Sequence, residues 1–403
     1  MAMDKKYIYA YALKNAIEHD GKAQAGAVVS GLFNKGLKKE QVKDVIPSIN
    51  KVLKEINSWP LERQKKELEK YQDLIGHRPE REGLPELPNV PKTGVIMRFA
   101  PAASGFLHVG HIISNMPSSL YVKKYGGKFY VRIEDTDPER VDINAYEQIK
   151  KDCDWIFGNV SEYIIQSGRM AVYYKYIEKL LDKGAVYVCT CENEKFKELA
   201  GNMKECPCRK LGTEENMKRW RKMLDPKGFK EGEAVVRFKS DINDPNPAMR
   251  DFPLARVNEH EHPKQGTKYR VWPLMNLSVS VDDIEYGMTH VIRGKDHMDN
   301  AARQKMIYHA LGLDKKYPWV FFMGRIKFSD IELSKRKIAA AIKEGKYTGF
   351  EDIRLPTIAS LRKRGYKPEA FAKLAEQRGL SEVDKVMSQK DFFEILDSFN
   401  KQV

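Results

Sequence analysis

The sequence has little of what a membrane-inserted or secreted protein requires. No apolar run approaches the roughly 20 residues that a membrane-spanning helix needs, and no apolar leader segment follows Met1. Cysteine is scarce, with five residues in 403, and four of these lie between Cys189 and Cys208. Thiols gathered in this way suit a metal in a reducing compartment better than a disulfide framework. We therefore expect a cytoplasmic protein without a membrane span.

Acidic residues are outnumbered by basic ones. The chain has 70 lysines and arginines against 56 aspartates and glutamates, which gives a net charge of +14. A basic surface attracts polyanions such as nucleic acid, although charge alone gives no specificity. A chain of 403 residues is also long enough for two or more domains, each with its own core.

The most informative stretch runs from Arg98 to Asp137. The apolar run Val95 to Phe99 predicts a strand, and a helical pattern begins near His108 after a turn that contains glycine. A strand that feeds a helix in this way presents backbone N–H groups and a positive helix end, which suit a phosphate. A nucleotide site is the first hypothesis. His108 and His111 also fit half of a metal site, or two ordinary surface histidines.

Several motifs carry a family resemblance. One set contains Pro101, Ser104, Gly105, His108, Gly110, His111 and the run Tyr130 to Asp137. It resembles the HIGH signature and the following RIEDTD strand of class I aminoacyl-tRNA synthetases, in the glutamyl and glutaminyl subgroup. The run Glu332 to Lys337 is similar to the KMSKS loop of that family. The phrase from Leu84 to Pro88 resembles the archaeal and eukaryotic branch, whereas Leu274 and Met275 replace the Thr-Tyr usual in the family.

The resemblance implies an α/β fold. We expect a Rossmann-type parallel-sheet catalytic domain split by a zinc-containing insertion, with an N-terminal helical domain and a C-terminal helical stem. The anticodon-binding β-barrels of the archaeal relatives are not expected within these residues. The implied divisions are 1–92 for the helical domain and a proline-rich linker, 93–185 and 269–340 for the two catalytic halves, 186–268 for the insertion that binds the tRNA acceptor end, and 341–403 for the stem.

The resemblance also implies the ligands ATP, Mg²⁺ and glutamate. ATP is expected at His108, Gly110, His111, Ser334, Lys335 and Arg336, of which His108, His111 and Lys335 are the expected catalytic residues. Glutamate is expected at Arg98, Ser104, Glu134, Met275 and Arg293. From charge alone, a guanidinium at Arg98 suits an acidic side chain, and a carboxylate at Glu134 suits an α-ammonium group.

Two C-x-C pairs, Cys189 with Cys191 and Cys206 with Cys208, predict a metal site. Four thiolates give a closed tetrahedral site, which is typical of structural Zn²⁺. Two pairs of free thiols without a metal are the alternative.

The resemblance implies an enzyme that activates glutamate with ATP and transfers it to the 3′ end of a tRNA, expected to be tRNA-Glu, and that acts as a monomer. One alternative is a stand-alone paralogue that activates glutamate or another amino acid for a modified nucleotide, a carrier or a small molecule. A second is a non-catalytic binding protein that keeps the fold and the basic surface.

Overall fold

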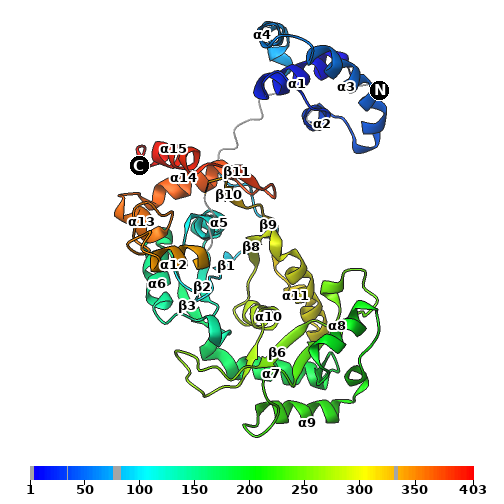
Figure 1. Ribbon diagram of the computed structural model, residues 1–403, viewed down its shortest axis with the longest axis vertical. Coiled ribbons are helices and arrows are strands. Elements are labelled where there is room, and N and C mark those ends of the chain that lie inside the picture. Colours follow the sequence, from blue (N-terminus) through cyan, green and yellow to red (C-terminus); the bar gives the residue numbers. More distant parts are fainter. Residues whose placement is uncertain (1–3, 34, 76–82, 331–334) are drawn as a thin grey trace. The chain divides into compact units, whose positions relative to one another are not determined.

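The computed structural model describes residues 4–33, 35–75, 83–330 and 335–403. The chain divides into two compact units, Met1–Glu80 and Arg81–Val403 (Figure 1). The first unit is helical: α1 (Lys5–Glu18), α2 (Ala25–Phe33), α3 (Val42–Ile56) and α4 (Leu61–Leu68). In α3 the buried residues Ile49, Val52 and Ile56 follow the spacing of one helix face. They share a core with apolar residues of α1 and α2, as expected for a small bundle.

The second unit is built around parallel strands. β1 (Val95–Phe99), β2 (Gly127–Ile133) and β3 (Glu162–Ile165) form one sheet, and β8 (His290–Gly294) pairs with β9 (Trp319–Met323). Thr289 joins the two pieces, since its N–H donates to Ile96 O at 3.0 Å and its Oγ1 accepts from Ile96 N–H at 2.9 Å. The strands therefore run in the order β3-β2-β1-β8-β9, which is typical of a doubly wound α/β fold.

Helices connect and cover these strands. α5 (Val109–Tyr125) links β1 to β2, and α6 (Ala145–Phe157) links β2 to β3. β2 starts at Gly127, where φ is +111° and a Cβ atom would lie 2.0 Å from Val95 O. Only glycine allows β1 and β2 to approach each other this closely. The helices and strands enclose the largest core of the molecule, which includes Phe99, Ile112 and Phe157.

A second sheet is antiparallel and lies within the predicted insertion and at its border. Its order is β4 (Val186–Cys189), β5 (Val235–Phe238), β6 (Pro253–Val257) and β7 (Val271–Pro273). The helices of this region are α7 (Met170–Asp182), α8 (Asn193–Gly201) and α9 (Thr213–Leu224). In Figure 1, α8 and α9 lie at one end of the unit, and the C-terminal helices lie at the other.

The position of β7 corrects one expectation. The apolar run after Tyr269 was expected to begin the second half of the parallel sheet, but β7 pairs with β6, and the run continues as the buried helix α10 (Met275–Glu285). The second parallel half starts at β8 instead. An apolar run does not distinguish a buried strand from a buried helix, because both are covered on all sides.

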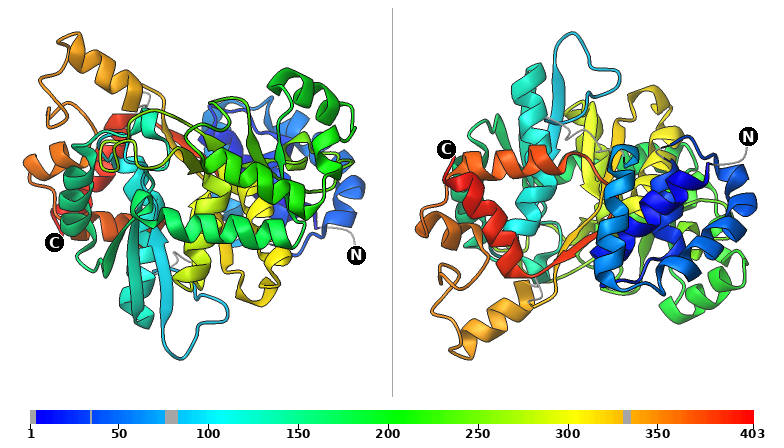
Figure 2. Two further views of the ribbon diagram at one scale, coloured as in Figure 1. Left: turned by 90° about the horizontal axis from the view of Figure 1, so that it is seen from below. Right: turned by 90° about the horizontal axis from the view of Figure 1, so that it is seen from above.

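The C-terminal part follows α11 (Met298–Leu311) and β9. It contains β10 (Ile326–Phe328), α12 (Lys335–Lys343), α13 (Ile358–Lys363), α14 (Pro368–Arg378), β11 (Lys385–Met387) and α15 (Gln389–Asn400). The expected stem is helical except for β11, which pairs with β10. α14 packs against α5 and α15 (Figure 2). Within the described ranges, no helix combines the length and the apolar character needed to cross a bilayer.

Candidate active site

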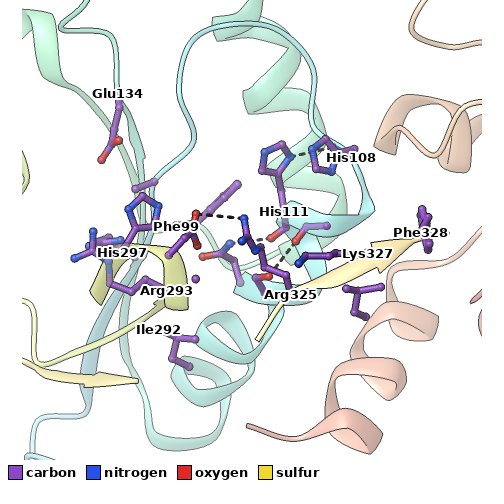
Figure 3. A pocket seen from close by; sticks show the side chains of 18 of the residues that line it. Phe99, His108, His111, Glu134, Ile292, Arg293, His297, Arg325, Lys327 and Phe328 are labelled. Carbon is purple, nitrogen blue, oxygen red and sulfur yellow. Dashed lines mark hydrogen bonds and ion pairs between the residues drawn. The ribbon is translucent and has the colours of Figure 1, made fainter. Parts of the chain in front are cut away.

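A cavity of about 910 Å³ lies at the carboxyl ends of β1, β2 and β8. Arg98 and Phe99 end β1, Glu134 follows β2, and Arg293 lies near the end of β8. The start of α5 and strand β10 complete the lining. Figure 3 shows Glu134, His297 and Arg293 toward one end and His108, Lys327 and Phe328 toward the other. Open α/β sheets commonly bind ligands at this edge.

The histidine end of the cavity is formed by the first turn of α5. His108 has extended torsion angles and caps α5, which begins at Val109. The His111 Nδ1 accepts from the His108 N–H at 3.2 Å, and the two ring centroids lie 3.8 Å apart. Both rings and Gly110 line the cavity at the positive end of α5, and this arrangement suits an anion. The predicted strand, turn and helix are confirmed here.

The chain around residue 357 fixes this end further. Val109 N–H donates to Pro356 O at 3.1 Å, and Ile358 N–H donates to Leu107 O at 3.0 Å. In the sequence, the KMSKS-like run Glu332 to Lys337 falls between Asp330, which also lines the cavity, and this contact. Ser334 itself lies outside the described residues, and so do the side chains of Lys335 and Arg336 at the start of α12.

The arginine end is built from buried charges. Arg98 donates to Asp283 through Nε at 3.3 Å and through Nη2 at 3.4 Å. The same carboxylate accepts from Arg132 Nη1 at 2.5 Å, and Arg132 also contacts Glu134 at 3.2 Å. Burial alone would raise the pKa of Asp283, but the charges of Arg98 and Arg132 outweigh it and lower that pKa. Asp283 is therefore an anion that neutralises part of the arginine charge.

Arg293 has a different environment. Its Nη1 donates to the neutral Oε1 of Gln304 at 2.8 Å, and no carboxylate of the described residues comes within ion-pair distance of it. Burial, and then the nearby charge of Arg98, lower the pKa of Arg293 to about 10. The group remains a cation at neutral pH. This charge is available for an acidic ligand.

The cavity brings together most of the residues that the sequence predicted. Those in its lining are Arg98, His108, Gly110, His111, Glu134, Met275 and Arg293. Ser104 is exposed in the loop between β1 and α5 and is not part of the lining. The sequence did not identify Gln304, Lys327 on β10, or Arg325 just before that strand. No local motif marks these residues, because only the tertiary fold brings them to the site.

The four clustered cysteines meet at the end of β4. The sulfur atoms of Cys189, Cys191, Cys206 and Cys208 all lie within 4.8 Å of one another. The Cys189–Cys206 and Cys191–Cys208 distances are 3.9 and 3.8 Å. Four sulfurs about 2.3 Å from a tetrahedral Zn²⁺ would lie about 3.8 Å apart. The donor set and its spacing therefore fit a metal ion.

Groups around Cys208 favour its thiolate form. Arg219 Nη1 donates to Cys208 Sγ at 3.3 Å, and Thr190 N–H donates to the same atom at 3.4 Å. Burial opposes ionisation of Cys208, but these contacts lower its pKa below the ordinary value. A thiolate is the form that binds a metal. Cys153 lies apart and buried, and burial raises its pKa, as expected for an inert thiol.

Comparison with known proteins agrees with the family resemblance seen in the sequence motifs. Residues 94–401 match the family model "tRNA synthetases class I (E and Q), catalytic domain". The glutamate–tRNA ligase of Methanothermobacter marburgensis is 43% identical over 394 residues, which cover 97% of this chain and 70% of that protein. The glutamate–tRNA ligase of Methanocaldococcus jannaschii is 43% identical over 394 residues, with 98% and 70% covered.

A solved structure is similar in fold. It is a glutamate tRNA ligase from Elizabethkingia meningosepticum in complex with its amino acid. The TM-score is 0.55 at 23% identity, and the match covers 76% of this chain and 69% of that one.

Proposed function

The chain belongs to the class I tRNA synthetases of the glutamate and glutamine subgroup, and from this premise we propose that it is a glutamate–tRNA ligase. It would activate glutamate with ATP and transfer the glutamyl group to the 3′ end of tRNA-Glu. One observation carries the proposal: a single cavity has guanidinium groups and a carboxylate at one end and a histidine-capped helix start at the other. Glutamate and a triphosphate need these two kinds of surface.

The arginine end suits glutamate. Glu134 would accept the α-ammonium group, and Arg293 would bind the side-chain carboxylate with support from Arg98. Met275 would supply an apolar wall for the methylene groups. Ser104 would assist only if its loop reached the ligand. The α-carboxylate then faces the histidine end, where it is needed for reaction.

The histidine end suits ATP. His108, Gly110 and His111 would bind the nucleotide and its phosphates, and Ser334, Lys335 and Arg336 would neutralise the departing pyrophosphate. Mg²⁺, when bound with ATP, supplies further charge neutralisation on the phosphates. In the first step, an oxygen of the α-carboxylate bonds to the α-phosphorus, and the bond to the pyrophosphate oxygen breaks.

The second step releases the nucleotide. A terminal ribose hydroxyl of the tRNA attacks the carbonyl carbon of the adenylate, loses its proton, and AMP leaves. No protein nucleophile takes part in either step. The contribution of the protein is positioning and charge stabilisation by His108, His111, Glu134 and Arg293.

The remaining assignments belong to the same proposal. The cysteine cluster would hold a structural Zn²⁺ and shape residues 186–268, the segment that would bind the acceptor end of the tRNA. Residues 93–185 and 269–340 would form the catalytic halves, 1–92 the helical domain with its linker, and 341–403 the stem. We propose a monomer that works in the cytoplasm, where tRNA and ATP are available.

ATP–pyrophosphate exchange tests the proposal. Each of the twenty amino acids is assayed with and without tRNA-Glu, and charging of tRNA-Glu is measured in parallel. We expect exchange and charging with glutamate in the presence of tRNA-Glu. Exchange with another amino acid, or exchange without any charging of tRNA, would instead favour the stand-alone paralogue. Complete absence of exchange would favour the non-catalytic binding protein.

A further inference from the structure

Gln304 on α11 contacts Arg293 but does not itself line the cavity. It is 4% exposed, and its Oε1 lies 2.8 Å from Arg293 Nη1. A guanidinium only donates hydrogen bonds, so the glutamine must present its oxygen to Arg293. The amide Nε2 then points to Asn276 Oδ1, 3.5 Å away on α10. Two buried amides from two helices therefore fix the orientation of one guanidinium.

The guanidinium held in this way still has donors to spare. Arg293 is 9% exposed, and its Nε has no hydrogen-bond partner among the described residues. Arg98, on the same wall, is instead paired with Asp283. A buried cation with unused donors is costly unless a ligand satisfies it, and a carboxylate is the ligand that suits a guanidinium best.

We propose that Gln304 is the positioning residue that holds Arg293 for the side-chain carboxylate of the amino acid, and that its neutrality reserves the arginine charge for that ligand. The inference rests on the proposed function and adds the residue that sets acidic-substrate preference. A glutamate at position 304 would form an ion pair with Arg293 and compete with the substrate for it. An apolar residue at position 304 would leave the charge of Arg293 unchanged, but the guanidinium would no longer be held in one orientation.

Two substitutions test the two parts of the proposal. Gln304→Glu keeps an oxygen beside Arg293 but adds a negative charge, and Gln304→Met keeps a similar volume without the hydrogen bond. The matched control is Tyr317→Phe, which removes a different hydrogen bond to α11, from the Tyr317 hydroxyl to Ala301 O at 3.0 Å. Pyrophosphate exchange with tRNA-Glu present gives the KM for glutamate, the KM for ATP and kcat for each variant.

The expected changes are confined to the amino acid. We expect Gln304→Met to raise the KM for glutamate about 10-fold and Gln304→Glu to raise it about 100-fold, because loss of a charged contact outweighs loss of one hydrogen bond. The KM for ATP should stay within about twofold, as for a site remote from the phosphates. Gln304→Glu should also reduce the preference for glutamate over glutamine, and Tyr317→Phe should change none of these values.

Three results would overturn the inference. One is an unchanged KM for glutamate in a folded Gln304→Met protein, which remains the test if Gln304→Glu does not fold. Another is an equal rise in the KM for ATP and for glutamate, since that indicates a general structural role. A third is absence of glutamate-dependent exchange in the unmodified protein, which removes the proposed function and the inference together. The first two leave the proposed function intact.

Discussion

The two ends of the cavity are held by different interactions. At the arginine end, Arg98 and Asp283 are 185 residues apart in the sequence, and their contact forms only when β1 and α10 meet. At the histidine end, His108 and His111 are three residues apart and contact each other within one helical turn. The histidine pair of the proposed phosphate site is therefore set by local geometry, whereas the proposed amino-acid site depends on contacts between distant parts of the chain. Substitutions that affect one end should leave the other largely intact.

The largest effect is expected from His111→Ala at the histidine end. The substitution removes an imidazole from the cavity wall and the acceptor for the His108 N–H. We expect glutamate-dependent exchange to fall about 10³-fold, because groups that stabilise charge in a transition state commonly contribute 10²–10³ or more. The KM for glutamate should change little.

The control for that experiment is His309→Ala, since His309 is exposed on α11 away from this cavity. It should retain full activity. Full activity of the His111→Ala protein would show that the phosphate end has been misplaced and that the comparison between the two ends fails.

The next largest effect is expected from Asp283→Asn at the arginine end. The substitution leaves Arg98 and Arg132 buried without their shared anion. We expect a loss of about 3 kcal/mol in unfolding free energy, which is typical of removing one partner of a buried ion pair. Urea unfolding measures it, and the KM for glutamate should rise with the KM for ATP unchanged. Wild-type stability in this variant would mean that the carboxylate does not hold the arginines.

A smaller effect is expected at the cysteine cluster, which belongs to neither end. Cys206→Ser removes one of four sulfur donors, so we expect bound zinc to be lost and the free energy of unfolding to fall by about 2 kcal/mol, since metal binding couples to folding. Metal content and thermal unfolding report this directly. The KM values for ATP and for glutamate should be unchanged. A normal zinc content in the variant would exclude Cys206 as a ligand.

The difference between local contacts and contacts of distant residues also explains which features could be predicted from the sequence. β1 has the bounds that its apolar run predicted, Val95–Phe99, because that pattern is local. The histidine motif was recognisable for the same reason. Gln304 was not, since its contact with Arg293 joins α11 to β8 through side chains alone. The start of the second catalytic half was placed too early, because an apolar run does not show which strand it pairs with, and its continuation as α10 fits either a strand or a helix.

Asp152 provides a comparison for Asp283, because it is also a buried carboxylate but has fewer positive charges beside it. Asp152 on α6 is fully buried, accepts from Gln148 at 2.9 Å, and lies 3.5 Å from Arg362. Burial outweighs both contacts and raises the pKa of Asp152 from 3.8 to about 6.

The sign of the pH dependence follows from this raised pKa. The folded protein binds the Asp152 proton more tightly than the unfolded chain does, so the stability from this group is complete below about pH 4 and falls until about pH 6. Asp152→Asn removes that loss and should be about 1 kcal/mol more stable than wild type at pH 7.5 and about equal at pH 4. Urea midpoints at pH 4, 5, 6 and 7.5 measure the change. If Asp152→Asn raises the free energy of unfolding and Asp283→Asn lowers it, the arginines, rather than burial, determine whether a carboxylate stabilises this fold. If both substitutions lower it at pH 7.5, this conclusion is contradicted.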